Sequence, residues 1–404
     1  MMNKLYALIF GLGLISQISN AQFDCSGGRY YQDVFPTFTL TSDVTYGEAL
    51  NVTGSLQSLE LDIYQPEGDT LSQRPLLILA HGGSFVFGSK TGLDVVALCY
   101  KFVKLGYVVV SIEYRLGFGG LPSVPSATKA VYRATSDMKA AIRFFRKSVG
   151  EGNPYRINPD YIFTGGVSAG AFTALHAAYI DQESEIPAEV DPIEFGGVEG
   201  NSGNPGFPSN TRAVVNLCGA IGDTSWINEG DVPNISMHGT NDGTVPYATD
   251  LITVLGFDLL TVDGSASIAQ RMNNLGIVHE FITWQGADHV PFVSDAQYQD
   301  SVYQFVIPFL ADQLGCDPTG ISAVEEASSL SLFPNPTSGT LFYQSNTLLS
   351  EVSLIDFAGR IVRNEKSPTL KSGSLDLSDL PSGIYLFQTT TLNGERMIRK
   401  VIVE

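Results

Sequence analysis

The sequence predicts a doubly wound, mostly parallel α/β sheet, followed by a small all-β sandwich domain. Through the first three quarters of the 404 residues, short apolar runs alternate with helix patterns, as in parallel sheets that are covered by helices on both faces. After residue 316 the composition changes to short alternating runs broken by turns, a pattern of strands without helices. We therefore predict a large domain over residues 22–316, a linker over 317–331 and a second domain over 332–404.

The first residues are predicted to be an export signal rather than part of the fold. Lys4 precedes an apolar run over residues 5–18, and small residues at 19–21 offer a cleavage site before Gln22. This order is typical of a secretory signal peptide, here over residues 1–21. The apolar run is too short for a permanent anchor, so we expect no stable membrane anchor.

Strand patterns and helix patterns then follow one another along the chain. Strands are expected at residues 59–64, 76–80, 108–112, 161–164, 213–217, 235–238 and 279–284. Helices are expected at residues 94–105, 127–148, 171–180, 265–275 and 295–314. In the second of these helices, small and apolar residues recur at helical spacing, which predicts a face packed against the sheet.

The most informative motif joins a predicted strand to a predicted helix. Its sequence is Gly166-Val167-Ser168-Ala169-Gly170, the pattern of a nucleophile elbow. Such a turn is so tight that the residues two before and two after the serine must be very small. The motif predicts that Ser168 is a nucleophile and that the N–H of Ala169 faces a developing oxyanion.

A second loop, which follows an earlier strand pattern, supports the same chemistry. Its sequence is His81-Gly82-Gly83-Ser84, and paired glycines let backbone N–H groups come close to a ligand. This loop lies in chain order where an oxyanion loop is expected.

A nucleophilic serine needs a base. The five histidines of the chain are His81, His176, His238, His279 and His289. His289 lies in a loop between the last predicted strand of the sheet and the closing helix, where its side chain can reach over the sheet edge. His289 is therefore the candidate base, and the other four histidines are expected to be structural.

The base needs a carboxylate, and the loop after the preceding strand supplies Asp242. This side chain is expected to accept the Nδ1 hydrogen bond of His289 and to fix the tautomer of the ring. Of the rival carboxylates, Asp223 comes a strand too early and Asp250 is expected in the following helix. Asp288 adjoins the histidine too closely to orient its ring easily.

The chain order Ser168, Asp242, His289 resembles that of α/β-hydrolases of the carboxylesterase and lipase type. The His-Gly-Gly loop and the strand at residues 108–116 belong to the same resemblance, which covers about residues 44–315. It implies acyl transfer to water through a serine ester, with an ester as substrate and without a cofactor. It also implies that the oxyanion hole consists of the backbone N–H groups of Gly83, Ser84 and Ala169. Many relatives carry a third glycine at the position of Ser84, which affects the expected substrate range more than the chemistry.

The segment at residues 181–212 is rich in Gly, Pro, Asn and Glu and is expected to be an irregular loop or cap over the sheet edge. Its large apolar residues, Phe195 and Phe207, are candidates for lining an acyl or alcohol pocket. A surface loop with no part in recognition is the alternative.

Four cysteines would enter an oxidising compartment with this chain. They are Cys25, Cys99, Cys218 and Cys316. One or two disulfides are expected, and the sequence permits three full pairings. Cys218, at a strand end, also fits a buried apolar residue.

The C-terminal region resembles the sorting domain of type IX secretion. The matching residues are the run from Phe333 to Gly339, the run from Ser382 to Tyr385, and the terminal residues 400–404. The resemblance implies that type IX secretion machinery recognises residues 332–404 and exports the chain through the periplasm to the cell surface or the medium. A carbohydrate-binding or adhesive sandwich is the alternative.

Charge excludes some classes of partner. The net charge is −19, from 23 Lys and Arg and 42 Asp and Glu. Residues 330–404 contain seven basic and seven acidic residues, so the whole excess lies in the earlier part. An acidic domain repels nucleic acid, and no nucleic-acid motif is present. We expect no metal site, because no two histidines have a metal-ligand spacing.

Three functions are compatible with these features. The leading one is a secreted serine carboxylic ester hydrolase. The second is a serine peptidase of the prolyl oligopeptidase type, which usually carries a propeller domain, and the segment before residue 59 is too short for one. The third is a non-catalytic exported adhesin, which would be expected to lack Ser168, Asp242 or His289.

Overall fold

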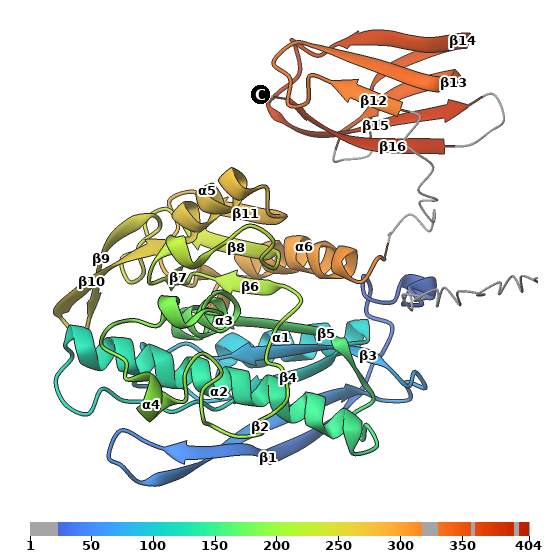
Figure 1. Ribbon diagram of the computed structural model, residues 1–404. Helices are drawn as coiled ribbons and strands as arrows, with labels where there is room; N and C mark the ends of the chain where they lie inside the picture. The colour runs from blue at the N-terminus through green and yellow to red at the C-terminus, as the bar shows by residue number, and fades with distance from the viewer. Residues whose placement is uncertain (1–22, 317–329, 357–359, 392–395, 404) are drawn as a thin grey trace, which may run out of the picture. The chain divides into compact units, whose positions relative to one another are not determined.

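The structure, a computed structural model, describes residues 23–316, 330–356, 360–391 and 396–403 (Figure 1). The chain divides into two compact units, with the boundary between Gly320 and Ile321. The predicted signal peptide at residues 1–21 and residues 317–329 of the predicted linker lie outside the described residues.

An eight-stranded sheet forms the centre of the first unit. In spatial order its strands are β1 (Phe38–Leu50), β2 (Leu56–Pro66), β4 (Val108–Ile112), β3 (Arg74–Ala80), β5 (Ile157–Val167), β6 (Val214–Leu217), β8 (Asn234–Gly239) and β11 (His279–Trp284). The strands from β4 to β11 pair in parallel, while β1 and β2 pair antiparallel at one edge. The predicted mostly parallel sheet is confirmed.

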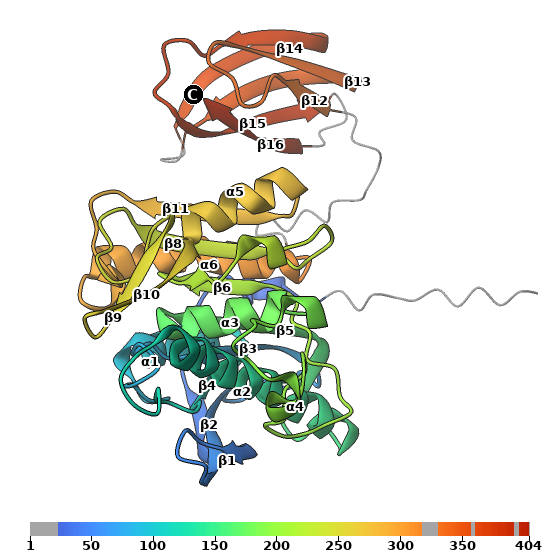
Figure 2. The same ribbon diagram turned by 60° about the vertical axis from the view of Figure 1, so that its left-hand side comes forward.

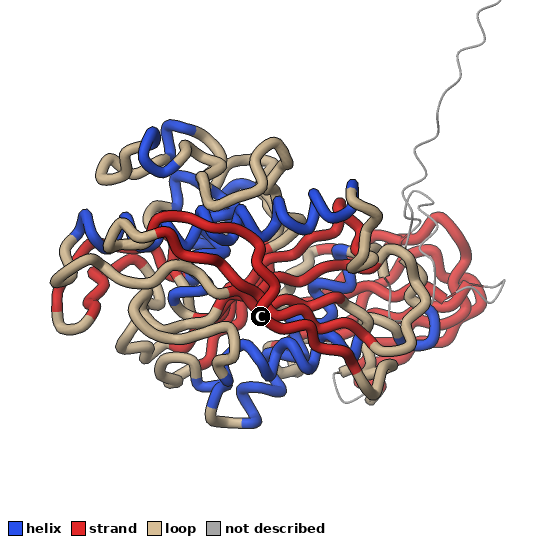
Figure 3. Tube along the Cα trace, turned by 90° about the horizontal axis from the view of Figure 1, so that it is seen from below, coloured by secondary structure: helices blue, strands red, loops and turns tan. Residues whose placement is uncertain are grey.

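Helices cover both faces of this sheet (Figures 1, 2 and 3). The longer helices are α1 (Leu93–Leu105), α2 (Val124–Gly150), α3 (Ala169–Tyr179), α5 (Ser265–Leu275) and α6 (Ala296–Gln313). Alternate residues of β3 show the two sides: Leu76 and Ile78 pack with α2, α3 and α5, whereas Leu77 and Leu79 pack with α1 and α6. The period of two in a strand thus gives the sheet two apolar cores.

A three-stranded antiparallel sheet stands beside the central one. It consists of β7 (Ala220–Ile221), β10 (Phe257–Gly264) and β9 (Thr249–Val254). The expectation that Asp250 lies in a helix is wrong, because Asp250 belongs to β9. The two-residue turn between β9 and β10 places both Leu255 (φ 53°) and Gly256 (φ 82°) in the left-handed region, which matches the twist of a hairpin.

Buried basic side chains of α2 hold the segment at residues 181–212, which contains the short helix α4 (Pro192–Phe195). Lys139, only 2% exposed, donates to the carbonyls of Ile180 (2.7 Å) and Val198 (2.8 Å). Arg143 donates to the carbonyl of Gly203 (2.8 Å). These bonds satisfy carbonyls of a segment with little regular structure, so the segment is tied to the domain rather than loosely attached.

A disulfide joins Cys25 to Cys316, one of the pairings that the sequence left open. It links the start of the described chain to the last residue before the segment at 317–329. Cys99 and Cys218 are buried free thiols. Cys218 follows β6 and packs in the apolar core that contains α1 and α6.

The second unit is entirely β in its described residues. Its strands are β12 (Leu330–Phe333), β13 (Thr340–Ile355), β14 (Ile361–Asp376), β15 (Gly383–Thr391) and β16 (Arg396–Val403). Neighbouring strands pair antiparallel, and β13 pairs with β12, β14 and β15. One apolar core, with Leu341, Phe387 and Val401 at its centre, lies between them. The predicted small all-β domain is confirmed.

Candidate active site

Ser168 stands on the turn between β5 and α3. Its backbone angles, φ 53° and ψ −118°, are strained for a residue with a side chain. The flanking glycines are required sterically, because a Cβ on Gly166 would overlap the backbone of Gly170 and a Cβ on Gly170 would overlap the carbonyl oxygen of Ala80. The strand and the helix can therefore come this close only with glycine at positions 166 and 170, which explains the spacing of the motif around Ser168.

The structure brings Ser168, His289 and Asp242 together. The Oγ of Ser168 lies 2.9 Å from Nε2 of His289, and Nδ1 of His289 lies 2.7 Å from Oδ2 of Asp242. A carboxylate can only accept at Nδ1, so the ring carries its proton there and Nε2 is free to accept the proton of Ser168. The three residues are far apart in sequence, since His289 follows Ser168 by 121 residues and Asp242 by 47.

Hydrogen bonds surround the carboxylate of Asp242, whose side chain is fully buried. Oδ1 accepts from the backbone N–H groups of Thr244 and Val245, both at 2.8 Å. Burial alone would raise the pKa of Asp242, but the hydrogen bonds from His238 and His289 outweigh it and hold the pKa well below its usual range. The carboxylate is therefore ionised at neutral pH.

His238 is a second histidine on the same carboxylate, which the sequence reasoning treated only as structural. Its Nε2 lies 3.1 Å from Oδ2 of Asp242, and its Nδ1 lies 2.8 Å from Oγ of Ser265. His238 is fully buried at the end of β8. The sequence signal for this contact was the position of His238, four residues before Asp242 and at the end of the strand from which the Asp242 loop starts.

The rival carboxylates have other partners. Asp288 accepts from the N–H groups of His289 (2.7 Å) and Gly243 (3.1 Å), so it holds the two site loops together through their backbones. Asp250 accepts from its neighbour Leu251. Asp223 caps a short helical turn by accepting from the N–H of Ser225.

The predicted oxyanion loop approaches Ser168 from the end of β3. The N–H of Gly82 donates to Asp94 at the start of α1 (2.7 Å), which fixes the loop. Gly83 has φ 119°, and a Cβ there would overlap the carbonyl of Phe87. Ser84 and Ala169 line the same cavity as Ser168. Within the described residues, the N–H groups of Gly83 and Ser84 donate no hydrogen bond.

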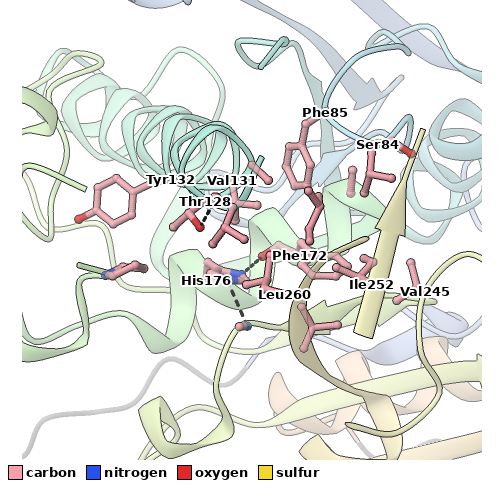
Figure 4. Close-up of a pocket in the computed structure, with 18 of the residues that line it drawn as sticks. Ser84, Phe85, Thr128, Val131, Tyr132, Phe172, His176, Val245, Ile252 and Leu260 are labelled. Carbon is pink, nitrogen blue, oxygen red and sulfur yellow. Dashed lines mark hydrogen bonds between the residues drawn. The ribbon is translucent and has the colours of Figure 1, made fainter. Parts of the chain in front are cut away.

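A cavity of about 340 Å³ opens beside Ser168. Figure 4 shows its walls: Phe85 comes from the oxyanion loop, Val131 from α2, Phe172 from α3, and Ile252 and Leu260 from the β9–β10 hairpin. These five side chains are apolar, and the lining also includes polar residues, among them Glu189 and Asp223. The cavity can therefore hold an apolar group next to the serine.

His176 lies in the cavity wall two turns of α3 beyond Ser168. Burial lowers its pKa to about 4, so the ring is neutral. Its Nδ1 donates to the carbonyl of Phe172 (2.7 Å), and its Nε2 accepts from the N–H of Gly222 (3.3 Å). His176 is thus a satisfied wall residue rather than a base.

Phe195 and Phe207, the candidates for lining a pocket, are not among the residues that line this cavity. Phe195 packs against the ring of Tyr132, with 5.7 Å between ring centroids, in a small separate cluster. The segment at residues 181–212 reaches the cavity through Pro187 and Glu189 instead. The β9–β10 hairpin, which the sequence reasoning did not identify, supplies six of the lining residues, more than any other element.

Cys218, Asp242 and His289 place one ligand atom each within 4.8 Å of one another. Burial raises the pKa of the Cys218 thiol, which stays protonated. Asp242 and His289 are hydrogen-bonded to each other. The cluster is therefore explained without an ion, and the expected absence of a metal stays a prediction.

Two family models match the chain. Residues 61–219 match the BD-FAE family, and residues 331–404 match the secretion system C-terminal sorting domain. The first unit thus has the fold of an α/β-hydrolase, part of which matches the BD-FAE family, and the second unit matches a C-terminal sorting domain. The sorting domain indicates export to the cell surface or the medium, as predicted. No helix among the described residues of this α/β-hydrolase is long and apolar enough to cross a membrane.

Curated proteins that are similar to this chain include gut esterases and carboxylesterases. Gut esterase 1 of Caenorhabditis briggsae is 30% identical over 146 residues, 35% of this chain and 25% of the relative. Carboxylesterase 3B of Mus musculus is 35% identical over 114 residues, 28% of this chain and 19% of the relative. The matches thus span no more than a quarter of the relatives' length.

Solved structures of similar shape include esterase 2 of Thermogutta terrifontis phosphorylated by paraoxon. It has a TM-score of 0.49 and 20% identity over 69% of this chain and 95% of its own. A truncated carbohydrate esterase from gut microbiota has a TM-score of 0.49 and 20% identity over 70% of this chain and 99% of its own.

Proposed function

We propose that this chain is a secreted carboxylic ester hydrolase that acts through an acyl-enzyme on Ser168. The observation that carries the proposal is a series of hydrogen bonds that runs from Ser168, on the strand-to-helix turn, through His289 to Asp242. The family match and the carboxylesterase relatives support the same activity.

In the first half-reaction, Oγ of Ser168 attacks the ester carbonyl while Nε2 of His289 takes the hydroxyl proton. The resulting oxyanion is stabilised by the N–H groups of Ser84 and Ala169, with Gly83 as a further donor, and this stabilisation develops only as the charge forms. The C–O bond to the alcohol then breaks, and His289 returns the proton to the alcohol oxygen.

In the second half-reaction, water replaces the alcohol. His289 takes one proton from the water, whose oxygen attacks the acyl carbon, and the same N–H groups hold the second oxyanion. When the bond to Ser168 breaks, His289 protonates Oγ and the carboxylic acid leaves. Asp242 stays ionised throughout, orienting the ring and stabilising its charged form.

We also propose the division of labour along the chain. The segment at residues 22–316 performs catalysis, and residues 332–404, joined by the linker at 317–331, are recognised by type IX secretion machinery. After cleavage of the signal peptide at 1–21 in the periplasm, this recognition would carry the folded enzyme outside.

A comparison of 4-nitrophenyl esters with aminoacyl 4-nitroanilides tests the activity. The wild-type enzyme should hydrolyse the esters, and Ser168→Ala should lose on the order of a thousandfold or more in kcat. Faster cleavage of the anilides would indicate a peptidase, and no turnover of either class by the folded wild type would indicate an adhesin.

A further inference from the structure

We propose that the cavity beside Ser168 binds the acyl half of the ester and is built for a linear, apolar acyl chain of medium length. This inference rests on the proposed ester hydrolysis and names its substrate class.

The position of His289 decides which half of the ester enters. His289 must protonate the departing alcohol oxygen, so the alcohol has to lie on the His289 side of the reacting carbon. The described residues that line the cavity include Ser84 and Ala169 on the oxyanion side but not His289. The acyl group is therefore the part that points into the cavity.

The floor of the cavity is one face of α3. Ser168, Phe172 and His176 follow one another at intervals of four residues and all line the cavity. At 1.5 Å per residue, the eight-residue separation from Ser168 to His176 corresponds to about 12 Å along the helix axis. At about 30 Å³ for each water-sized group, the volume of about 340 Å³ holds about eleven such groups. An acyl chain of roughly eight to ten carbons fits these dimensions.

The side chains along the floor and the hairpin wall favour an apolar acyl group. Phe172, Ile252 and Leu260 surround its path (Figure 4). The polar groups deeper inside already have partners, since the hydroxyl of Tyr132 donates to the carbonyl of Gly197 (2.8 Å) and both ring nitrogens of His176 are bonded. A charged acyl group would lose its hydrogen bonds with water beside these apolar side chains, and a negatively charged one would also be repelled by Glu189 and Asp223, which line the cavity as well.

The β9–β10 hairpin provides the matched residues for a test. Ile252 lines the cavity, whereas its neighbour Leu251 is 46% exposed and lies outside it. On the opposite wall, Thr128 of α2 lines the inner half beside His176 (Figure 4). Within the part of the chain that the structure describes, its hydroxyl donates to the carbonyl of Val124 in the same helix and to no other group, so a larger side chain there would fill the cavity.

The experiment measures kcat/KM for 4-nitrophenyl acetate, butanoate, octanoate and hexadecanoate. The wild type should prefer octanoate to acetate by about tenfold or more, since each buried CH₂ contributes about 0.8 kcal/mol. Thr128→Phe should lower the octanoate to butanoate ratio by at least about tenfold, and Ile252→Ala should lower it by about fivefold. Leu251→Ala should leave the ratio unchanged.

Binding to Ser168→Ala provides a readout without turnover. Octanoate should raise its Tm more than acetate or 4-hydroxycinnamate does, and Thr128→Phe in the same background should remove the difference. A preference for acetate or for the hydroxylated aromatic acid, or equal ratios in Thr128→Phe and the wild type, would overturn the inference. Binding of octanoate without hydrolysis of any ester would uphold the acyl site and contradict the proposed function.

Discussion

Asp242 is the most completely partnered side chain of the site. Two backbone N–H groups hold one of its oxygens, and His238 and His289 face the other. Such a carboxylate cannot rotate without leaving buried donors unpaired, which costs about 1–3 kcal/mol for each group. The orientation of His289 is therefore fixed before any substrate binds.

Asp242→Asn should lower kcat by roughly a thousandfold or more, because an amide can present a donor to Nδ1 and so favours the wrong tautomer of His289. Steady-state kinetics on one ester measures the effect. Asp288→Asn keeps an acceptor oxygen for the N–H groups of His289 and Gly243, and Asp250→Asn alters an exposed strand. Both should stay close to wild type, and a larger loss at Asp288 would show that it is the orienting carboxylate.

His176 should make the stability of the enzyme sensitive to mild acid. Burial lowers its pKa to about 4, whereas an unfolded chain protonates histidine near pH 6.5. Between these values only the unfolded state binds the proton, so stability is complete above about pH 6.5 and falls as the pH drops toward 4, by an amount on the order of 3 kcal/mol.

Urea unfolding of the wild type and of His176→Gln at pH 7.5, 6, 5 and 4 measures this difference. The free energy of unfolding of the variant should vary less over this range, because glutamine does not titrate. Parallel curves for the two proteins would show that the His176 ring is not buried as a neutral group.

Ser168, Asp242 and His289 could be proposed from the sequence because each chemical role requires one residue type in a particular kind of loop. The contact of His238 with Asp242 could not, since a histidine at a strand end has the same sequence appearance whether it faces a carboxylate or a backbone carbonyl. That distinction depends on the path of the loop at residues 239–246.

At the scale of elements, α2 performs two tasks with different faces. Its small apolar residues, such as Ala134 and Ala141, pack against the sheet. Its basic residues Lys139 and Arg143 bind carbonyls of the segment at residues 181–212. Burial lowers the pKa of Lys139 to about 8, so the ammonium is still mostly charged at neutral pH.

Lys139→Met should destabilise the fold by about 1–3 kcal/mol, because the carbonyls of Ile180 and Val198 would be left without their buried donor. Chemical unfolding at pH 7 measures the loss. Lys147→Met on the same helix is the control, since Lys147 forms only an exposed ion pair with Glu151 (3.8 Å) and should change stability by no more than about 0.5 kcal/mol. Equal losses in the two variants would contradict the account.

The elements that the sequence predicted best are those with an unbroken period. The buried strand at 108–112 and the helix at 265–275 have the predicted bounds. The hairpin of β9 and β10 lacked its usual signal, because its turn uses Leu255 where Asn or Asp is typical. In β1, two irregularities of pairing near Asp43 and Tyr46 interrupt the alternation from which a strand is recognised.

At the scale of the whole molecule, the apolar cores belong to separate units: two lie on the faces of the sheet in the first unit, and one lies in the second unit. The disulfide from Cys25 to Cys316 closes the first unit just before the segment at 317–329. A unit with its own core and its own crosslink is expected to fold without the other. Catalysis and export are then separable properties.

A chain that ends at Gly320 should hydrolyse esters with nearly the kcat/KM of the full chain, because all residues of the site precede Cys316. In the native host it should accumulate in the periplasm instead of reaching the surface or the medium. Cell fractionation with an esterase assay measures both. Normal export of the shortened chain, or a folded but inactive product, would mean that the second unit serves the enzyme rather than its transport.

The central claim is that Ser168 is the residue that becomes acylated. Treatment with a fluorophosphonate, followed by intact mass measurement and peptide mapping, tests this directly. The account predicts one adduct per chain, located on Ser168, with activity lost in proportion to labelling and no adduct on Ser168→Ala. Complete inactivation with the adduct on another residue, or labelled enzyme that retains full activity, would contradict it.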